Sequence, residues 1–487
     1  MVTEAQLKKV AGAGNVSDAP AALEAFAGDS SFVGKMRPRF VVKVLEAEKV
    51  KDLVDLARET GTPLVPVSSD APHFLGDTVP TTGDAVILDL SGMKQISFID
   101  RVGRVAVVEP GVTFGELIPA VAEHGLRLNM PLRPRATKSV LGSMLSREPV
   151  IMPHYHWDIS DPIGSTEVVF GTGDVFRTGS AANPGTIEEQ RQAGGVQKEA
   201  AGPSANSWHR VIQGAQGTMG IVTWASCRCE LLPRLEQPYF IGSSELPELL
   251  EVIHWLVRLR LGNECLIVDR SFMAVLTAND DAEHARLVAG LPPWVLFFNL
   301  VAYDYLPEQR MEGQIEDTKE LLQRLGVEAA QSLGGVSARR FLETIREPSP
   351  QPYWKIGRAG ACQDIFFVTT LTKIPGLVEL MTKATEAAGF PTARLGVYLQ
   401  PIVQGTNCHC EFSLFYDPAD AAETQAVRAL ATDVIRPLMG AGAFFSRPFG
   451  EAARQIMNED GATVEALKKV KAIVDPAGIL NPGKLCF

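Results

Sequence analysis

The stretch that decides the fold is DAVILDLSGMKQISFIDRVGRVAVVEPGVTFGELIPAVAEHGL, residues 84–126. It contains two short apolar runs, AVILDL and GRVAVVEPG, which are typical of buried strands. The next run, TFGELIPAVAEHG, predicts a helix that begins at Thr113, because Glu116 lies three residues later and a glycine ends the run. Strands followed directly by a helix predict a domain that mixes both kinds of element.

The same mixture continues on both sides of this stretch. Residues 39–45 are β-rich, residues 47–61 carry a helical stripe of apolar side chains, and residues 164–179 predict a hairpin. Residues 181–207 are polar and have few apolar anchors, so we expect an excursion loop there. From residue 245 to 440, long helical patterns lie between strands, which predicts a second α+β domain.

Composition limits the class of protein. With 487 residues, 46% apolar and 21% charged, the chain has the composition of an ordinary globular protein and is too long for one hydrophobic core. A net charge of −11 argues against a nucleic-acid or anionic-membrane partner. We find no signal peptide and no apolar window of membrane-spanning length. Seven irregularly spaced cysteines indicate reduced thiols and a cytoplasmic protein.

Two further segments join the opening stretch: GAQGTMGIVT (214–223) and KAIVDPAGILNPGK (471–484). In this order the three resemble the flavin-binding fold of the vanillyl-alcohol oxidase family, also called the p-cresol methylhydroxylase type. The segments GVYLQPIVQGTNCHCEFSLFYDPAD (396–420) and AGAFFSRPF (441–449) resemble the cap domain of its 4-alkylphenol-oxidising branch.

The resemblance implies an α+β, two-domain flavin-oxidase fold with FAD as cofactor. It divides the chain into an N-terminal helical arm (1–35), an FAD-binding domain (36–236), a cap or substrate domain (237–440) and a C-terminal segment that returns to the FAD-binding domain (441–487). It also implies a homodimer, a small-molecule substrate and, as a further possibility, an electron-acceptor protein as partner.

Residues near the cofactor are expected in several turns. PGVT (110–113), SVLGS (139–143) and GTMG (217–220) are small-residue turns that let a backbone approach a cofactor closely. Residues 67–77, VSSDAPHFLGD, align with the diphosphate loop of the family, although Gly76 is their only glycine and Asp70 adds a negative charge. Ser68 and Ser69 supply hydroxyl and N–H donors there. The cofactor-binding candidates are Ser68, Ser69, His73, Gly76, Pro110, Gly111, Val112, Leu141, Gly142, Gly217, Gly220, Ile221, His409, Asn481 and Lys484.

Covalent attachment of the flavin is an open alternative. Some family members link the flavin to a histidine or tyrosine, and His409 lies at or beside the expected linking position of the cap. The alternative is that His409 is a plain core or strand histidine. His73 lies one position from the place where a linking histidine of the diphosphate loop would align.

Three interpretations fit MPHYHWDISD, residues 152–161. In the family this segment passes over the reactive face of the flavin, which implies that Asp158, His156 and Tyr155 belong to the catalytic site, with Asp158 as the base or hydride-transfer partner. A second interpretation is a metal site made by His154, His156 and Asp158. The third is a structural turn.

Arg447 aligns with an arginine that holds the substrate phenolate in the alkylphenol branch, and its fixed fork of donors suits that role. Two phenol-binding tyrosines of the branch are replaced by Leu75 and Ser446. The expected function is FAD-dependent removal of hydride from a benzylic or alcohol carbon of a 4-alkylphenol-like or related aromatic substrate. The alternatives are a 2-hydroxy-acid dehydrogenase of the same fold and a non-catalytic flavoprotein subunit that scaffolds a partner.

Overall fold

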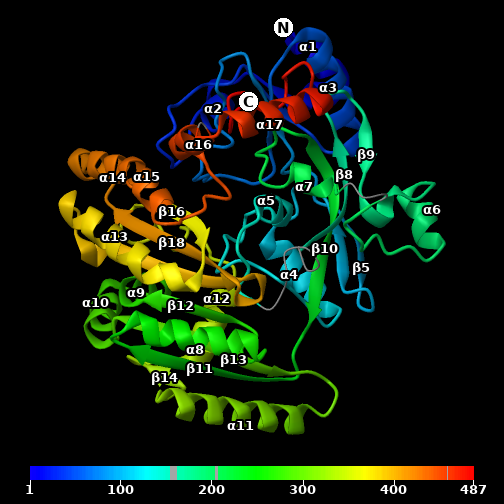
Figure 1. Ribbon diagram of the computed structural model, residues 1–487. Helices are drawn as coiled ribbons and strands as arrows, with labels where there is room; N and C mark the ends of the chain where they lie inside the picture. The colour runs from blue at the N-terminus through cyan, green and yellow to red at the C-terminus, as the bar shows by residue number, and fades with distance from the viewer. Residues whose placement is uncertain (154–161, 203–206, 458) are drawn as a thin grey trace.

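The computed structural model describes residues 1–487 except 154–161, 203–206 and 458. It has two lobes, each built around β-sheet, and the chain crosses between them after strand β10 (Ile221–Leu231) (Figure 1). Among the described residues, no helix has the length and apolar character needed to span a membrane.

A four-stranded sheet begins the first lobe. Strands β2 (Phe40–Lys43), β4 (Val86–Asp89) and β3 (Leu64–Val67) are parallel neighbours, and helix α3 (Ala47–Thr60) joins β2 to β3. The helix buries the stripe that the sequence predicts, and it ends at Gly61 in the left-handed conformation. The stripe consists of Val50, Leu53, Val54 and Ala57.

The first residues of the chain are partly built into this sheet. Besides helices α1 (Glu4–Ala11) and α2 (Pro20–Glu24), they form β1 (Val16–Ser17), which pairs antiparallel with β2. A helical arm is therefore an incomplete description. Two residues of strand are too few to show the alternation from which a strand is predicted.

A second, antiparallel sheet completes the first lobe. Its strand order is β5 (Ile96–Asp100), β6 (Val105–Val108), β10, β8 (Ile163–Val169) and β9 (Val175–Arg177), and β7 (Leu126–Leu128) also pairs with β10. The predicted helix is present as α4 (Phe114–Glu123), where the Glu116 carboxylate accepts the Thr113 backbone N–H at 2.9 Å. Within the described part of the expected excursion, Ile187–Gln192 form the short helix α6.

The second lobe is a six-stranded antiparallel sheet flanked by helices. Its strand order is β11 (Leu235–Ser243), β13 (Trp294–Ala302), β12 (Cys265–Asp269), β17 (Leu395–Ile402), β18 (Asn407–Tyr416) and β16 (Ala361–Thr369). Helices α8 (Leu246–Arg258), α11 (Pro307–Leu325), α13 (Ile374–Ala387) and α14 (Ala421–Asp433) contribute side chains to one core with this sheet.

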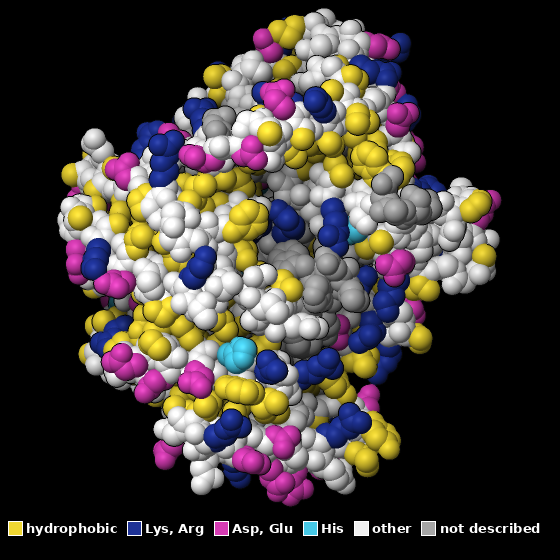
Figure 2. All heavy atoms as spheres, in the orientation of Figure 1, with side chains coloured by type: hydrophobic (Ala, Val, Ile, Leu, Met, Phe, Trp, Pro, Cys, Tyr) yellow, Lys and Arg dark blue, Asp and Glu magenta, His cyan; other side chains and the backbone are white. Residues whose placement is uncertain are grey.

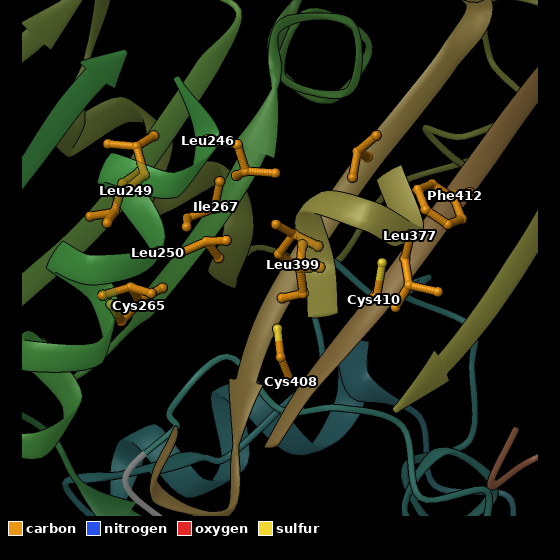
Figure 3. Packing of buried hydrophobic residues seen from close by; sticks show 14 of the residues in the cluster. Leu246, Leu249, Leu250, Cys265, Ile267, Leu377, Leu399, Cys408, Cys410 and Phe412 are labelled. Atoms are coloured by element: carbon orange, nitrogen blue, oxygen red, sulfur yellow. The ribbon is translucent and has the colours of Figure 1, made fainter. Parts of the chain in front are cut away.

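Figure 3 shows part of this core, which lies on one face of the six-stranded sheet. We call this sheet the cap sheet. Leucines of α8 pack toward Ile267 of β12, and Leu377 of α13 lies near Cys410 and Phe412 of β18. The apolar members of each strand point into this layer. Their alternate neighbours face the other side. There Leu266, Val268 and Phe297 pack in a second core with α9 (Arg270–Thr277) and α12 (Ala338–Arg346), whereas those of β16 and β18 lie toward the first lobe.

The C-terminal segment returns to the first lobe. Helix α17 (Gly461–Val474) lies near the N-terminal helices (Figure 1), and the backbone N–H of Leu64 donates to the Ile479 carbonyl at 2.8 Å. At the end of α17, Lys471 pairs with Asp475, the residue that follows the helix, and the Asp475 carboxylate accepts the Leu480 backbone N–H. The tail is thus fixed against the beginning of β3.

Candidate active site

Two adjoining cavities lie where the lobes meet. The larger, of about 240 Å³, is bounded by the 66–78 loop, the 131–149 segment and the exposed face of the cap sheet. The smaller, of about 120 Å³, lies deeper in the first lobe. They share Pro66, Ser68, Asp77, Gly142 and Ser146, so they form one channel. Figure 2 shows a hollow between the lobes with Lys and Arg side chains beside it.

The smaller cavity collects residues that are far apart in the sequence. Its walls include Ser68 of the 66–78 loop, Pro110, Gly142 of α5 (Val140–Leu145), Gly217 and Ile221. Leu141 and Gly220 also line it. These are the turns that the sequence predicts at the cofactor, and the structure brings them into one wall.

Glycine is needed for two different reasons around this channel. At Gly142 and Gly217 the backbone borders the cavity, and a Cβ would meet Ser68 at 3.1 Å or Pro66 at 2.5 Å. Gly76 has φ +76°, and its Cβ would meet Val33 at 2.3 Å, so its constraint comes from the N-terminal segment.

Gly111 and Val112 also lie behind the cavity wall. A Cβ on Gly111 would approach backbone carbonyls of residues 90–93, the nearest at 2.5 Å, and Val112 is buried in the core. These two residues and Gly76 support the wall from behind.

The C-terminal tail braces the 67–77 loop. Asn481 Nδ2 donates to the Asp77 carbonyl at 2.9 Å and to the Gln216 carbonyl at 2.7 Å. Lys484 Nζ donates to the Gly76 and Val79 carbonyls at 2.7 and 2.6 Å. Both predicted tail residues therefore hold backbone around the channel in place.

The channel fits a long cofactor that has a polar linker and an apolar ring. Ser68 and Ser69 lie on its wall, and the imidazole Nε2 of His73 is buried without a partner among the described residues. Asp70, whose charge would oppose a diphosphate, is exposed, and its carbonyl accepts Arg135 Nη1 at 3.1 Å. The scarcity of glycine in the loop therefore does not close the site.

The cap sheet presents a polar face to the larger cavity. On β16 the alternate residues Cys362, Asp364 and Phe366 line it, and on β18 Glu411 does. His409 and Ser413 flank Glu411 on the same face of β18, and in the register Asp364 lies opposite Ser413 and Phe366 opposite Glu411. Tyr398 of β17 lies beside Glu411. Strands β16 and β18 are apolar on one side and more polar on the other, because one face packs on helices and the other meets the first lobe.

A buried ionic cluster occupies the centre of this polar face. Lys355 Nζ lies 2.6 Å from both Asp364 Oδ2 and Glu411 Oε1, and 3.4 Å from Ser413 Oγ. Burial lowers the pKa of Lys355, but the two carboxylates outweigh burial and raise it well above the usual value. Burial raises the pKa of Glu411, and Lys355 overcomes this and holds it well below the usual range.

Arg447 reaches the same cavity from the C-terminal segment. It is 8% exposed, its guanidinium lies 4.5 Å from the centre of the Phe366 ring, and Nη1 donates to the Ser146 carbonyl at 3.3 Å. Burial lowers its pKa to about 10, so it remains a cation at neutral pH. No carboxylate of the described residues lies within 4 Å of it. The group is therefore poised for an anion.

A second arginine and an ion pair complete the opposite wall. Arg135 is 5% exposed and lies 5.5 Å from the Phe74 ring, and burial lowers its pKa. Lys138 pairs with Glu148, which also accepts the Ser143 hydroxyl at 2.6 Å. Arg135, like Arg447, has only a carbonyl as hydrogen-bond partner among the described residues.

The two histidines that we consider for covalent attachment occupy different environments. His409 is buried on β18, with Nε2 3.3 Å from Glu411 Oε2, and burial lowers its pKa. His73 lines the larger cavity, and burial together with Arg135 lowers its pKa to about 4. Both are neutral at pH 7.

The predictions on residues 152–161 fall largely outside the described residues. His154, Tyr155, His156 and Asp158 all lie there, so the structure does not place them. Among the residues that it does place, no three His, Cys, Asp or Glu side chains are grouped as a metal site would require.

Sequence reasoning missed most of the cap residues in this site. Lys355, Asp364 and Glu411 were not recognised, nor were Arg135 and Tyr353. A signal was present in β18, since NCHCEFSLFY places polar residues at every second position of an otherwise apolar strand. Leu75, which replaces a phenol-binding tyrosine of the alkylphenol branch in our alignment, borders the cavity, and Tyr353 and Tyr398 line it from other positions.

Comparisons with known families support a flavoenzyme. Residues 38–179 match the family described as "FAD binding domain", and residues 264–485 match "FAD linked oxidases, C-terminal domain".

Curated relatives are distant in sequence. An uncharacterized FAD-linked oxidoreductase of Mycobacterium tuberculosis (strain H37Rv) is 23% identical over 98% of both chains. The 4-cresol dehydrogenase [hydroxylating] flavoprotein subunit of Pseudomonas putida is 27% identical over 46% of this chain and 41% of its own. Glycolate oxidase subunit GlcD of Bacillus subtilis is 29% identical over 47% of this chain and 45% of its own.

Solved structures share the fold over nearly the whole chain. p-Cresol methylhydroxylase with substrate bound has a TM-score of 0.81 at 19% identity, and covers 99% of this chain and 95% of its own. 4-Ethylphenol oxidase from Gulosibacter chungangensis has a TM-score of 0.79 at 17% identity, with the same coverage. The two-domain flavin-oxidase fold is confirmed, and so are FAD as cofactor and an FAD-dependent oxidoreductase, either an oxidase or a dehydrogenase.

Proposed function

We propose that this FAD-dependent oxidoreductase removes hydride from a benzylic or alcohol carbon of an aromatic, 4-alkylphenol-like substrate. FAD supplies the hydride acceptor when bound. The residues that would hold it are those of the channel wall, among them Ser68, Ser69, Gly142 and Gly217, with His73 beside them.

The observation that carries the proposal is the state of Arg447. It is a buried cation with no carboxylate of the described residues within 4 Å, and it lies on the wall of the larger cavity. Glu148 and Glu411 act on its pKa from beyond ion-pair distance, so its guanidinium donors are still available to a ligand, and a buried ionised group of this kind is often functional. A phenolate or another anionic oxygen would supply the missing partner.

The remaining walls suit an aromatic ring. Phe74, Tyr353, Trp354, Phe366 and Tyr398 all line the larger cavity. Flat apolar faces enclose an arene, exclude water and strengthen the charge interaction with Arg447. The substrate ring would thus lie between the first lobe and the cap sheet.

The likeness to 4-cresol dehydrogenase and 4-ethylphenol oxidase supports the same substrate class. In this proposal Asp158 is the base or hydride-transfer partner, with His156 and Tyr155 near it. A cytoplasmic location, a homodimer and an electron-acceptor protein are parts of the same proposal, as are the domain boundaries at 36, 237 and 441.

One observation favours a second function, the oxidation of a 2-hydroxy acid. Arg135 is a second buried cation of the larger cavity, and two arginines suit a carboxylate. The relative named glycolate oxidase subunit GlcD supports this alternative. The aromatic walls favour the first function.

The test is anaerobic mixing of the FAD-loaded protein with a small panel of compounds. The panel contains 4-hydroxybenzyl alcohol, 4-ethylphenol, glycolate and D-lactate, and the loss of flavin absorbance is recorded. Reduction by a phenol and not by the hydroxy acids supports the proposal. Reduction by a hydroxy acid alone transfers the assignment to the second function.

A further inference from the structure

The buried cluster of Lys355, Asp364 and Glu411 costs free energy of folding, and a function would explain why the chain keeps it. Two carboxylates and one ammonium are removed from bulk water, which leaves one negative charge in excess. Purely structural sheets bury apolar side chains at such positions, as the opposite face of the same strands does. The cluster also borders the proposed substrate cavity, where perturbed ionisable groups are most often functional.

The three charged groups do not have equal access to the cavity. The side chain of Asp364 is 25% exposed, against 12% for Glu411 and 8% for Lys355. Lys355 forms an ion pair with each carboxylate, and Asp364 and then Glu411 raise its pKa, so the exposed fractions alone distinguish the two acids. Asp364 is therefore the member that can meet a ligand.

The hydrogen bonds around Asp364 leave it capacity for one more donor. Oδ2 accepts from Lys355 at 2.6 Å, and Oδ1 accepts from Ser413 at 2.6 Å and from the Cys362 thiol at 3.3 Å. A carboxylate has about four lone-pair sites. The remaining site lies at Oδ2, on a residue that lines the cavity.

Arg447 and Asp364 give this cavity two chemically different walls. Arg447 offers donors to an anionic oxygen, whereas Asp364 offers an acceptor to a hydroxyl. Both side chains also line a neighbouring cavity of about 90 Å³, so they border the same part of the site. A substrate that uses both has an anionic oxygen and a separate hydroxyl group.

We propose that Asp364 accepts the hydrogen bond of the carbinol hydroxyl of the substrate and takes its proton during oxidation, with Lys355 as the positioning residue. This inference rests on the proposed function and names the substrate class as a hydroxybenzyl-type alcohol. The O–H bond breaks and its proton goes to the Asp364 carboxylate, which leaves Asp158 the role of hydride-transfer partner. The C–H hydrogen leaves with its electron pair to FAD, and a carbonyl forms.

The groups that face Asp364 come from several elements. Lys355 and Tyr353 approach from the segment before β16, Cys362 from β16 itself, and Glu411 from β18. Beyond Glu411 lie His409, which is neutral, and Arg447. Lys355 is the only cation of the described residues that contacts Asp364 directly, so its removal would leave Asp364 and Glu411 without their shared cation.

A matched pair of ligands tests the contact without any turnover. 4-(2-Hydroxypropan-2-yl)phenol and 4-tert-butylphenol have the same shape, differ by one hydroxyl against one methyl, and lack a benzylic hydrogen. Their dissociation constants are measured from the change in flavin absorbance. The preference of the wild type for the carbinol should fall about tenfold in Asp364→Ala. Asp433→Asn, an exposed carboxylate at the end of α14, should leave it unchanged.

Kinetics then test the proton transfer. With 4-hydroxybenzyl alcohol, Asp364→Asn should reduce its flavin about 100- to 10,000-fold more slowly while FAD stays bound. Lys355→Met should also slow flavin reduction, because it removes the cation that positions Asp364, and Lys355→Arg should largely restore the rate.

The outcomes separate this inference from the proposed function. If neither phenol perturbs the flavin of the wild type, the aromatic substrate class is wrong and the inference falls with it. If both bind and Asp364→Ala keeps the full preference, only the inference is overturned. A wild-type reduction rate in Asp364→Asn assigns the proton to another group, such as Asp158.

Discussion

Glu264 links the two lobes, and its loss should destabilise the protein by an amount that depends on pH. Its Oε1 lies 2.7 Å from Arg127 Nη1 of the first lobe and accepts Arg346 Nε at 2.8 Å, and Oε2 accepts Asn299 at 2.9 Å. Burial raises the pKa of Glu264, but the two arginines outweigh it and lower the pKa from 4.5 to about 2. Such a difference corresponds to about 3 kcal/mol of stability.

The sign follows from the lowered pKa. The stabilisation is complete above pH 4.5 and is lost as the pH falls from about 4.5 toward 2. Glu264→Gln keeps the shape of the side chain and removes its charge. At pH 7 the free energy of unfolding of the variant should therefore be about 3 kcal/mol lower than that of the wild type. For a chain of this length that is about 3 °C in melting temperature, if the lobes unfold together.

Thermal unfolding followed by circular dichroism, at pH 7 and pH 3.5, measures both effects. The difference in melting temperature between the wild type and Glu264→Gln should be smaller at pH 3.5 than at pH 7. Glu379→Gln is the control, since Glu379 pairs with Lys383 on an exposed helix surface and should change nothing measurable. Equal melting temperatures of the wild type and Glu264→Gln at pH 7 would refute the stabilising role of Glu264. A difference in melting temperature that increases at pH 3.5 would refute it as well.

Three further predictions concern the cofactor and the catalytic segment. Gly76→Val should lose FAD. The backbone at residue 76 has φ +76° and lies against Val33, so a valine side chain does not fit there and the 67–77 loop would move. Full FAD occupancy of the variant would refute this. Acid precipitation tests covalent attachment of the flavin through His409 or His73. If either histidine is linked, the yellow colour of the flavin should stay in the protein pellet. Colour solely in the supernatant shows that neither is linked. Asp158→Asn should slow flavin reduction about 100- to 10,000-fold with FAD retained, whereas a metal site at His154, His156 and Asp158 requires a stoichiometric ion and loss of activity with a chelator.

Much of the fold is readable from local patterns. The helix over 114–123 follows from a capping box at Thr113, and α3 follows from its apolar stripe. These features are decided by neighbours in sequence. The two-residue strand β1 is not, because its pairing with β2 depends on a distant segment.

Some parts of the site are likewise predictable from local sequence, and others are not. Turns such as 139–143 and 217–220 are visible from their small residues, and they do meet at the channel. The Lys355 cluster is not visible, since its three members lie on separate segments that only the sheet register aligns. Gly76 was expected to face the cofactor, yet it packs on Val33, a contact that no local pattern reveals.

The central claim is that Arg447 holds an anionic oxygen of an aromatic substrate above the cofactor. The most direct measurement compares anaerobic flavin reduction by 4-hydroxybenzyl alcohol in wild type and in Arg447→Lys. Lysine keeps the charge but loses the planar fork, so the apparent dissociation constant should rise more than the limiting rate falls. An unchanged dissociation constant in Arg447→Lys, or a wild type that no phenol reduces, would contradict the account.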